Sequence, residues 1–261
     1  MNFSFYEIAW YFCIYAMLGW CVEVCFCTVN TGKFVNRGFL NGPVCPIYGF
    51  GMVIILLVLT PLADRFLALY IGAVLLTSAL ELVTGFVLKK LFHTTWWDYS
   101  DVPFNIGGYI CLKFSLMWGI GGVAVIKGLH PVVEKIVGLM PHTLGIIALC
   151  FITVLFACDL IVTINAISKM NKDLGRINEI AKKLHAGSDV LAERLGDGAL
   201  AVDEKIDGAK LNAGVRLDLA KAEWAEKKYF VQARLLKAFP DMKNSRYAEA
   251  LSALKEWYEK K

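Results

Sequence analysis

The sequence predicts an all-α, polytopic membrane protein with five transmembrane helices and a helical tail at its C-terminus. Hydrophobic residues make up 57% of the chain and charged residues only 19%, below the roughly one quarter that soluble domains carry. Charge is sparse over residues 5–167 and recurs every few residues over 168–261. The first part also contains five apolar stretches close to the ~20 residues that a bilayer crossing needs. The first part is therefore predicted to lie in the lipid bilayer and the second part in water.

The five apolar stretches give the predicted domain organisation. They cover residues 6–28, 46–62, 67–88, 109–126 and 142–167. The second is the shortest, and we expect it to begin with an irregular entry around Pro46. We therefore predict a membrane domain over residues 1–167 and a cytosolic helical tail over residues 168–261.

Basic residues predict the orientation, because cytoplasmic flanks of membrane helices carry an excess of Lys and Arg. Such residues follow the first, third and fifth stretches: Lys33, Arg37, Lys89, Lys90, Lys169, Lys172 and Arg176. The opposite side holds Arg65, Lys127 and Lys135. This bias places the N-terminus outside and the C-terminus in the cytoplasm. The arrangement agrees with an odd number of spans, which requires the two ends to lie on opposite sides of the membrane.

Two loops on the predicted cytoplasmic side are rich in Gly, Pro, Asn and aromatic residues. Loop one covers residues 33–51, and loop three covers residues 96–111. Irregular backbone at membrane depth is tolerated where protein or a wet cavity covers it. We therefore expect both loops to dip into, or cap, the mouth of the helix bundle; for Trp96, Trp97 and Tyr99, anchoring at the membrane interface is the alternative. The loop residues of interest are Asn36, Arg37, Gly38, Asn41, Gly42, Pro43, Cys45, Pro46 and Tyr48 in loop one, and Trp97, Asp98, Tyr99, Asn105 and Cys111 in loop three.

Three carboxylates lie inside the predicted spans: Glu23, Glu81 and Asp159. An acidic residue at mid-helix costs about 2.5 to 3.5 kcal/mol on insertion scales, so such residues usually serve a purpose. One interpretation is structural, with Arg37 and Lys113 as the cationic partners. The other is a site for a cation, a proton or a polar substrate. The candidate residues of that site are Glu23, Glu81, Arg37, Asp159 and Trp20, the last of which shares a helix face with Glu23.

Several classes of function find no support in the sequence. There is no P-loop, HExxH or GxSxG motif, and no nucleophile is identifiable with its base. The eight cysteines show no zinc-type spacing with the histidines, so we predict no metal and no cofactor. A net charge of +4 without aromatic interleaving does not indicate a nucleic-acid binder.

The tail predicts a long helix interrupted near its end. Apolar residues follow a heptad-like pattern over residues 167–184 and an eleven-residue period over residues 183–227. Pro240 should break the helix, and residues 245–260 form a second short helix with Leu251 and Leu254 on one side. A coiled coil that builds a homo-oligomer is the first interpretation; a helix on the anionic inner leaflet and a solvated tail are the alternatives.

The loops and the carboxylates resemble a known bacterial family. The motifs are Gly-Trp-x-x-Glu at 19–23, Asn-Arg-Gly-Phe-Leu-Asn-Gly-Pro-x-Cys-Pro-Ile-Tyr-Gly-Phe-Gly at 36–51, Glu-Leu-x-Thr-Gly at 81–85, Trp-Asp-Tyr-Ser at 97–100 and Pro-Phe-Asn at 103–105. Together with residues 111–119, they resemble the putative ABC-transporter permeases of the CmpB type over roughly residues 5–131. The resemblance implies a permease of the bacterial inner membrane, working in the lipid bilayer with a separate ATP-binding subunit.

Three functional hypotheses follow, in this order. The first is a permease whose polar site uses Glu23, Glu81 and Arg37 and is gated by loops one and three. The second is an assembly protein that recruits partners through its tail. The third is a membrane-embedded enzyme acting on lipid substrates, in which Asp98, Asp101 and Asn105 bind a metal and a phosphate.

Overall fold

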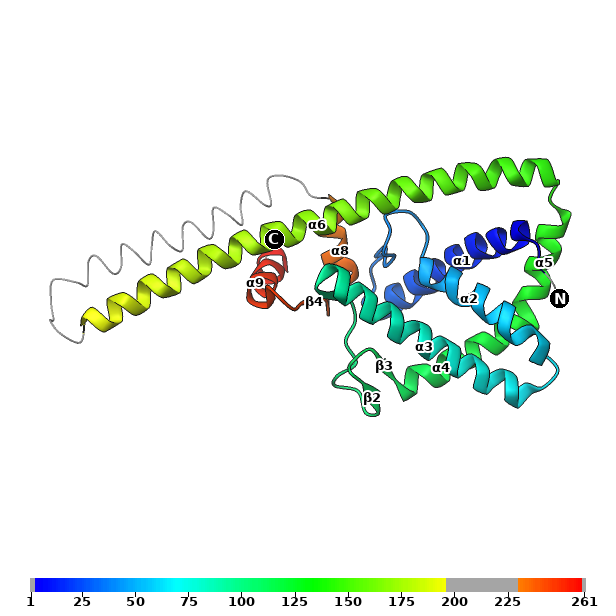
Figure 1. Ribbon diagram of the computed structural model, residues 1–261, viewed down its shortest axis with the longest axis horizontal. Coiled ribbons are helices and arrows are strands. Elements are labelled where there is room, and N and C mark those ends of the chain that lie inside the picture. Colours follow the sequence, from blue (N-terminus) through cyan, green and yellow to red (C-terminus); the bar gives the residue numbers. More distant parts are fainter. Residues whose placement is uncertain (1–2, 196–229, 260–261) are drawn as a thin grey trace. The chain divides into compact units, whose positions relative to one another are not determined.

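The computed structural model describes residues 3–195 and 230–259, and the described chain is mostly helical (Figure 1). The helices are α1 (Phe5–Thr31), α2 (Pro46–Leu59), α3 (Phe66–Phe92), α4 (Leu112–Ala124), α5 (His130–Leu139), α6 (His142–Leu195), α8 (Phe230–Ala238) and α9 (Ala248–Glu259). A 3₁₀ turn, η1 (Thr60–Leu62), follows α2, and a π-helical turn, η2 (Val125–Leu129), joins α4 to α5. Four two-residue strands are β1 (Thr94–Thr95), β2 (Asn105–Ile106), β3 (Ile110–Cys111) and β4 (Lys243–Asn244).

The chain divides into two compact units. The membrane unit comprises Met1–Ile164 and Arg234–Met242, and the tail unit comprises Asn165–Ala233 and Lys243–Lys261. Helix α6 contributes to both units, because it runs without a break from His142 to Leu195.

Helix α1 shows why these residues form long membrane helices. Its 27 residues are largely apolar and span about 40 Å at 1.5 Å per residue. Ser4 accepts a hydrogen bond from the amide of Glu7, and the Glu7 carboxylate accepts one in return from the Ser4 amide. This capping box satisfies the first amides of the helix. At the other end Gly32 adopts a left-handed conformation and its amide donates to the Thr28 carbonyl, which ends the helix.

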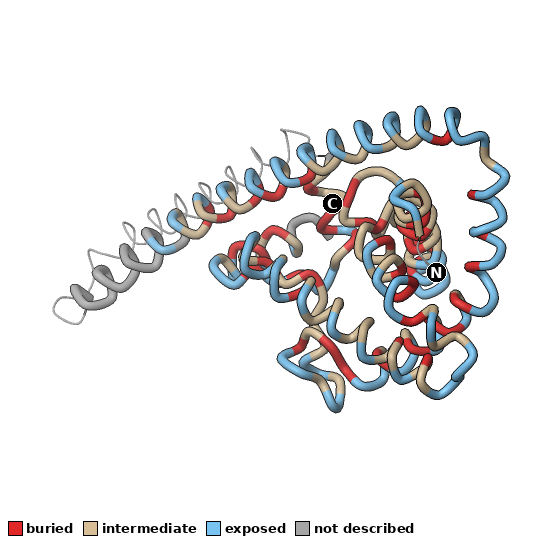
Figure 2. The backbone as a smooth tube through the Cα atoms, turned by 45° about the vertical axis from the view of Figure 1, so that its right-hand side comes forward, coloured by how far each residue is buried: buried red, intermediate tan, exposed pale blue. Residues whose placement is uncertain are grey.

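The core of the membrane unit joins α1, α2, α3 and the region from α4 to α5. Tyr15 in α1 is buried, and its hydroxyl lies 3.1 Å from Nδ1 of His130 at the start of α5. The other buried core residues are Trp10, Tyr11, Met52, Ile55, Leu56, Leu59, Leu69, Ala73, Val123, Ile126, Val133 and Val137. Most of α6 over residues 142–164 remains exposed in the isolated chain (Figure 2).

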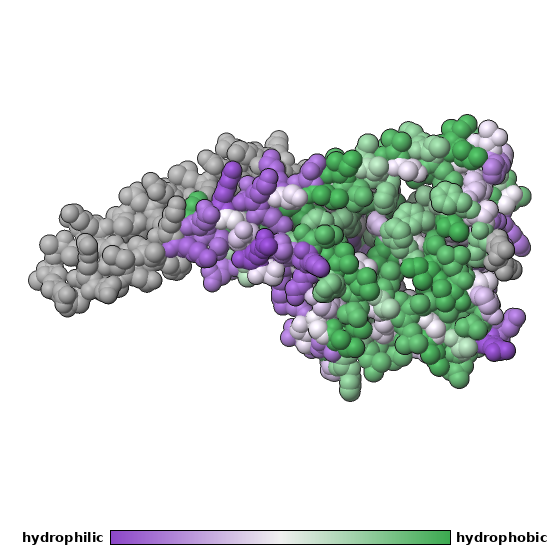
Figure 3. Space-filling view, viewed as in Figure 1, coloured by the Kyte–Doolittle hydropathy of each residue, from purple (hydrophilic) through white to green (hydrophobic). Residues whose placement is uncertain are grey.

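Among the described residues, four helical segments are long and apolar enough to cross a membrane: Phe5–Thr31, Phe66–Phe92, Leu112–Leu139 and His142–Ile180. The segment Pro46–Leu62 is apolar but shorter. Large apolar side chains face outward on α1, α2, α3, α4 and α6, and Figure 3 shows them covering the visible face of the membrane unit. An exposed apolar surface of this extent is suited to lipid. The prediction of a helical membrane protein is therefore confirmed.

The fourth predicted span is displaced from the predicted residues 109–126. Ile110 and Cys111 form strand β3, which pairs antiparallel with β2, and the helix begins only at Leu112. Gly107 and Gly108, both at positive φ, reverse the chain between these strands. Beyond Ala124 the helix continues through η2 into α5 as far as Leu139, whereas the predicted span ends at residue 126. The prediction missed the hairpin because its strands are only two residues long.

The tail unit contains the predicted short C-terminal helix, α9. The predicted apolar stripe of α6 is buried at Ile167, Met170, Leu174 and Ile177. Gly175 of this helix lies against the ring of Tyr247, and Asn244 donates a 3.0 Å hydrogen bond to Asn171. Most of the predicted eleven-residue pattern falls on residues 196–229, which lie outside the described residues.

Candidate functional site

Loop one turns back beside α1 before α2 begins. The amide of Cys45 donates a 2.9 Å hydrogen bond to the carbonyl of Ala16. Ala16 lies fifteen residues before the end of α1 at Thr31, which corresponds to about 22 Å along the helix. Loop one therefore runs along the last four turns of α1 and carries its side chains toward that helix.

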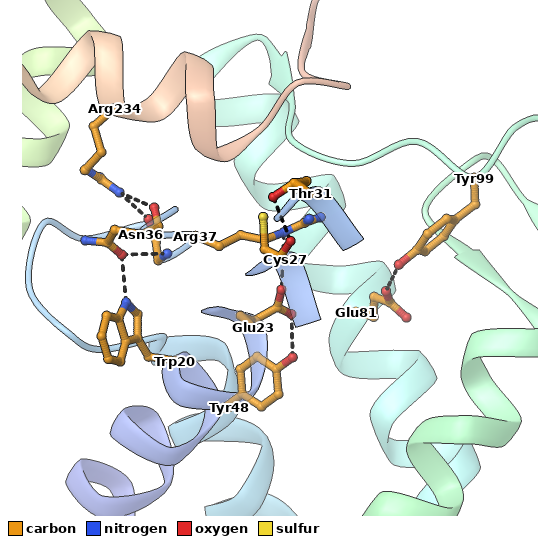
Figure 4. A network of polar contacts seen from close by, with 11 residues as sticks. Trp20, Glu23, Cys27, Thr31, Asn36, Arg37, Tyr48, Glu81, Tyr99 and Arg234 are labelled. Carbon is orange, nitrogen blue, oxygen red and sulfur yellow. Dashed lines mark hydrogen bonds and ion pairs between the residues drawn. The ribbon is translucent and has the colours of Figure 1, made fainter. Parts of the chain in front are cut away.

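Glu23 and Arg37, both predicted site residues, form an ion pair. Arg37 Nε lies 3.3 Å from Glu23 Oε2, and the Tyr48 hydroxyl donates a 2.6 Å hydrogen bond to Glu23 Oε1 (Figure 4). The Glu23 side chain is 25% exposed and that of Arg37 30%. Each oxygen of the carboxylate thus has a partner from loop one, and one of these partners, Tyr48, lies in the first turn of α2.

Asn36 holds loop one against α1. Its side-chain oxygen accepts a 2.7 Å hydrogen bond from Trp20 Nε1 and a 3.1 Å bond from the amide of Gly38. Its side-chain nitrogen donates to the Asn41 carbonyl at 2.7 Å. Trp20, predicted as part of a binding site, therefore contacts the loop directly.

Asp159 is joined to the same loop. Its carboxylate accepts hydrogen bonds from the amides of Asn41 at 3.0 Å and Gly42 at 2.7 Å, and from the Asn41 side chain at 2.7 Å. Thr163, one turn later in α6, accepts a further bond from Asn41. The Asp159 oxygens therefore accept hydrogen bonds from the loop backbone and from the Asn41 side chain, whereas Arg37 pairs with Glu23.

Arg234 was not predicted as a site residue. Its guanidinium donates to the carbonyls of Gly38 at 2.6 Å and Phe39 at 3.0 Å and to the side chain of Asn41 at 3.1 Å. It belongs to α8, at a sequence separation of 193 residues from Asn41. The sequence around Arg234 carries no motif, so only the fold could reveal this contact.

Glu81 in α3 meets loop three rather than Arg37. The Tyr99 hydroxyl donates a 3.1 Å hydrogen bond to Glu81 Oε1. Glu81 Oε2 is buried and has no hydrogen-bond partner among the described residues. The Tyr99 ring also stacks on Phe114 at 4.9 Å. Burial, followed by the charge of Glu81, raises the pKa of Tyr99 well above its ordinary value, so this hydroxyl remains a hydrogen-bond donor.

These contacts divide the predicted site into three parts. Glu23 and Trp20 meet loop one through Arg37 and Asn36, Asp159 meets it through Asn41 and Gly42, and Glu81 meets loop three through Tyr99. A family model described as "Putative ABC-transporter type IV" matches residues 10–164, more than half of the chain.

The chain belongs to this family. The predicted resemblance is therefore confirmed, and the match extends through the membrane portion to the end of the membrane unit's part of α6. No curated protein and no solved structure matches the chain in the two other comparisons. All the contacts of Glu23, Glu81 and Asp159 described above fall within the region matched by the type IV family. Arg234 lies outside that region.

In this type IV family member, several polar residues of loop three build the loop itself. Asp98 accepts hydrogen bonds from the amide and hydroxyl of Ser100. The Asn105 side chain donates to the carbonyls of Ser100 at 3.1 Å and Val102 at 2.8 Å, and Trp97 Nε1 donates to the Tyr109 carbonyl at 2.9 Å. Within the described part of the chain, no group of three or more His, Cys, Asp or Glu side chains could hold a metal ion.

Two buried cysteines occupy corresponding places in the family region. Cys45 precedes α2 and Cys111 precedes α4, and each is the extended N-cap residue of its helix. Both side chains are buried. Pro43 lies in the loop just before Cys45, and Pro46 is the first residue of α2, where its missing amide hydrogen costs nothing.

Cys45 should react very slowly with thiol reagents. Burial, reinforced by the charge of Glu23, raises the pKa of its thiol from 9.0 to about 12. Only the thiolate reacts. At pH 7, a difference of three pKa units lowers the thiolate fraction about a thousandfold relative to an ordinary thiol. We expect maleimide labelling of Cys45 to be at least that much slower than labelling of a free cysteine peptide. Labelling by mass spectrometry between pH 7 and pH 9 should show about a tenfold increase per pH unit, and a rate equal to that of the peptide would contradict the described burial.

Proposed function

We propose that the chain is the membrane-spanning permease subunit of a bacterial inner-membrane transporter and works with a separate ATP-binding subunit. Its substrate or ion site is formed by Glu23, Arg37, Trp20 and Glu81, with Tyr48 and Tyr99 holding the two glutamates. Loops one and three cover this site at the cytoplasmic side. We assign Asp159 the neighbouring role of fixing loop one.

Five crossings fit this proposal, with the N-terminus outside and the C-terminus in the cytoplasm. The segment Pro46–Leu62 measures about 25 Å as a helix, slightly less than the ~30 Å of a bilayer core. It can complete a crossing if Cys45 lies below the membrane surface, with loop one covering the entry. The distribution of Lys and Arg described above supports this orientation.

The observation that carries the proposal is the unpartnered oxygen of Glu81. The carboxylates of Glu23 and Asp159 have hydrogen-bond or ionic partners on both oxygens. Glu81 Oε2 is buried without one among the described residues. A buried polar group left unsatisfied is costly and needs an explanation, and an acidic side chain within a span is a functional residue by default. A proton or a cationic group of a substrate would satisfy this oxygen.

Purification of the tagged protein from native membranes tests the transporter assignment. We expect an ATP-binding protein to be recovered in stoichiometric amount and identified by mass spectrometry. The same preparation should be measured by native mass spectrometry, because we propose that the tail, residues 168–261, supports a homo-oligomer. Recovery of the chain without any ATP-binding protein would contradict the ATP-driven permease.

The stability of the protein should respond differently to loss of charge at the two glutamates. Glu23→Gln leaves Arg37 without its counter-ion and should lower the free energy of unfolding by about 1 kcal/mol. The loss is this small because both side chains of the ion pair are partly exposed to solvent. Glu81→Gln removes an unsatisfied buried charge and should leave stability unchanged or raise it, while transport falls. Thermal unfolding in nanodiscs measures both effects. Equal destabilisation by both substitutions would argue that Glu81 is a structural residue.

A further inference from the structure

Residues 234–242 pack with the membrane unit although they lie near the C-terminus. They are grouped with Met1–Ile164 by their contacts. Their apolar side chains are buried at Leu235, Leu236, Ala238 and Met242. The segment therefore has a defined docking position on the membrane unit.

The first contact of this segment is made with loop one. Arg234 donates to the carbonyls of Gly38 and Phe39 and to the Asn41 side chain. The planar guanidinium offers five N–H donors, and here it binds three residues of the loop within a stretch of four. Because Asn41 also binds Asp159, Arg234 extends the contacts that fix the loop.

The second contact reaches loop three. The ring of Phe239 lies 5.0 Å from that of Trp96, and Trp96 lies 5.2 Å from Phe39 of loop one, both in edge-to-face geometry. Trp96 is only 3% exposed. Such edge-to-face pairs are favourable beyond the area that they bury. Phe239 thus completes an aromatic row that includes both loops.

We infer that residues 234–242 form a C-terminal latch, which holds loops one and three together and must leave them for the cytoplasmic mouth to open. Arg234 fixes loop one, and Phe239 fixes Trp96 of loop three. The name "mouth" rests on the proposed function, but the latch itself does not depend on which substrate passes. The chain enters the latch from the tail unit after Ala233 and returns to the tail unit at Lys243, so the latch links the tail to both loops.

Cys45 is a native reporter for this latch. Its side chain is buried, and its amide donates to the carbonyl of Ala16 where loop one lies against α1. Release of loop one would uncover it. Cys13, in the middle of α1, reports on the integrity of the membrane helices.

The test is pulsed labelling of the full-length protein in nanodiscs with N-ethylmaleimide, with each cysteine quantified by mass spectrometry. The variants are Arg234→Ala, Arg234→Lys and Phe239→Ala, with Arg246→Ala at an exposed position as the matched control. We expect Cys45 to react about tenfold faster or more in Arg234→Ala and Phe239→Ala, less so in Arg234→Lys, and at the wild-type rate in Arg246→Ala. Cys13 should keep its wild-type rate in every variant.

Two results would overturn the latch. The first is a Cys45 rate in Arg234→Ala and Phe239→Ala equal to that of Arg246→Ala, because the loops would then stay closed without these contacts. The second is a parallel rise at Cys13 and Cys45, because the segment would then support the whole fold. Recovery of an ATP-binding partner is measured separately, so failure of the transporter assignment and failure of the latch give different results.

Discussion

Gly19→Ala should destabilise the protein by about 3 kcal/mol and displace Tyr48 from Glu23. A Cβ atom at position 19 would overlap Cβ and Cγ of Tyr48 and lie 2.7 Å from its Cδ1. These atoms are the base of the side chain and cannot move without moving α2 or the ring. Overpacking of a helix contact commonly costs about 1–3 kcal/mol and sometimes more. The displaced ring would lose its 2.6 Å hydrogen bond with Glu23.

The matched control for this substitution is Gly138→Ala. Gly138 lies in α5, and nothing lies within 4 Å of a Cβ atom placed there. Alanine favours a helix over glycine by about 1 kcal/mol, so this control should be neutral or slightly stabilising. Thermal unfolding of both variants in nanodiscs makes the comparison. Equal midpoints for Gly19→Ala and Gly138→Ala would contradict the close packing of α1 and α2.

The long helices could be predicted from the sequence because membrane helices depend on local composition. Apolar runs of the required length predict α1, α3 and the first part of α6, and glycine-rich and proline-rich stretches predict the loops between them. The helical continuation from Ala124 to Leu139 was missed, since Lys127, Glu134 and Lys135 interrupt the apolar run from which the span was predicted. There the apolar positions Val133 and Val137 face the core and keep the segment helical.

The site was partly predictable for a related reason. A carboxylate in a span needs a partner, so the sequence predicted Arg37 as a partner for the buried acids without specifying Glu23. The partners of Glu81 and Asp159 are a tyrosine hydroxyl and backbone amides, which any sequence contains in abundance. Arg234 is one of many basic residues in the tail. Which of these groups becomes a partner depends on which distant segments pack together in the folded chain. Local sequence patterns do not contain that information.

Asp159→Ala should release loop one and lower stability by about 2–4 kcal/mol. The substitution leaves the amides of Asn41 and Gly42 and the side chain of Asn41 without their acceptor. Each donor left unsatisfied in a partly buried position costs about 1–3 kcal/mol, and water that reaches the loop recovers part of this. Thermal unfolding measures the loss, and labelling of Cys45 measures the release of the loop.

Asp159→Asn and Cys158→Ala separate the possible causes of such a loss. Asparagine keeps one oxygen, which can accept from either the Asn41 amide or the Gly42 amide. Its NH₂ group then faces the other amide, which loses its acceptor. Its effect should be about half that of alanine.

Cys158 is the exposed neighbour on the same helix, so its replacement should change neither measurement. Wild-type stability in Asp159→Ala would show that loop one is held without this carboxylate, and Asp159 would then return to consideration as part of the transport site. Destabilisation with faster Cys45 labelling would instead make Asp159 the fixed end of the loop that Arg234 and Arg37 complete.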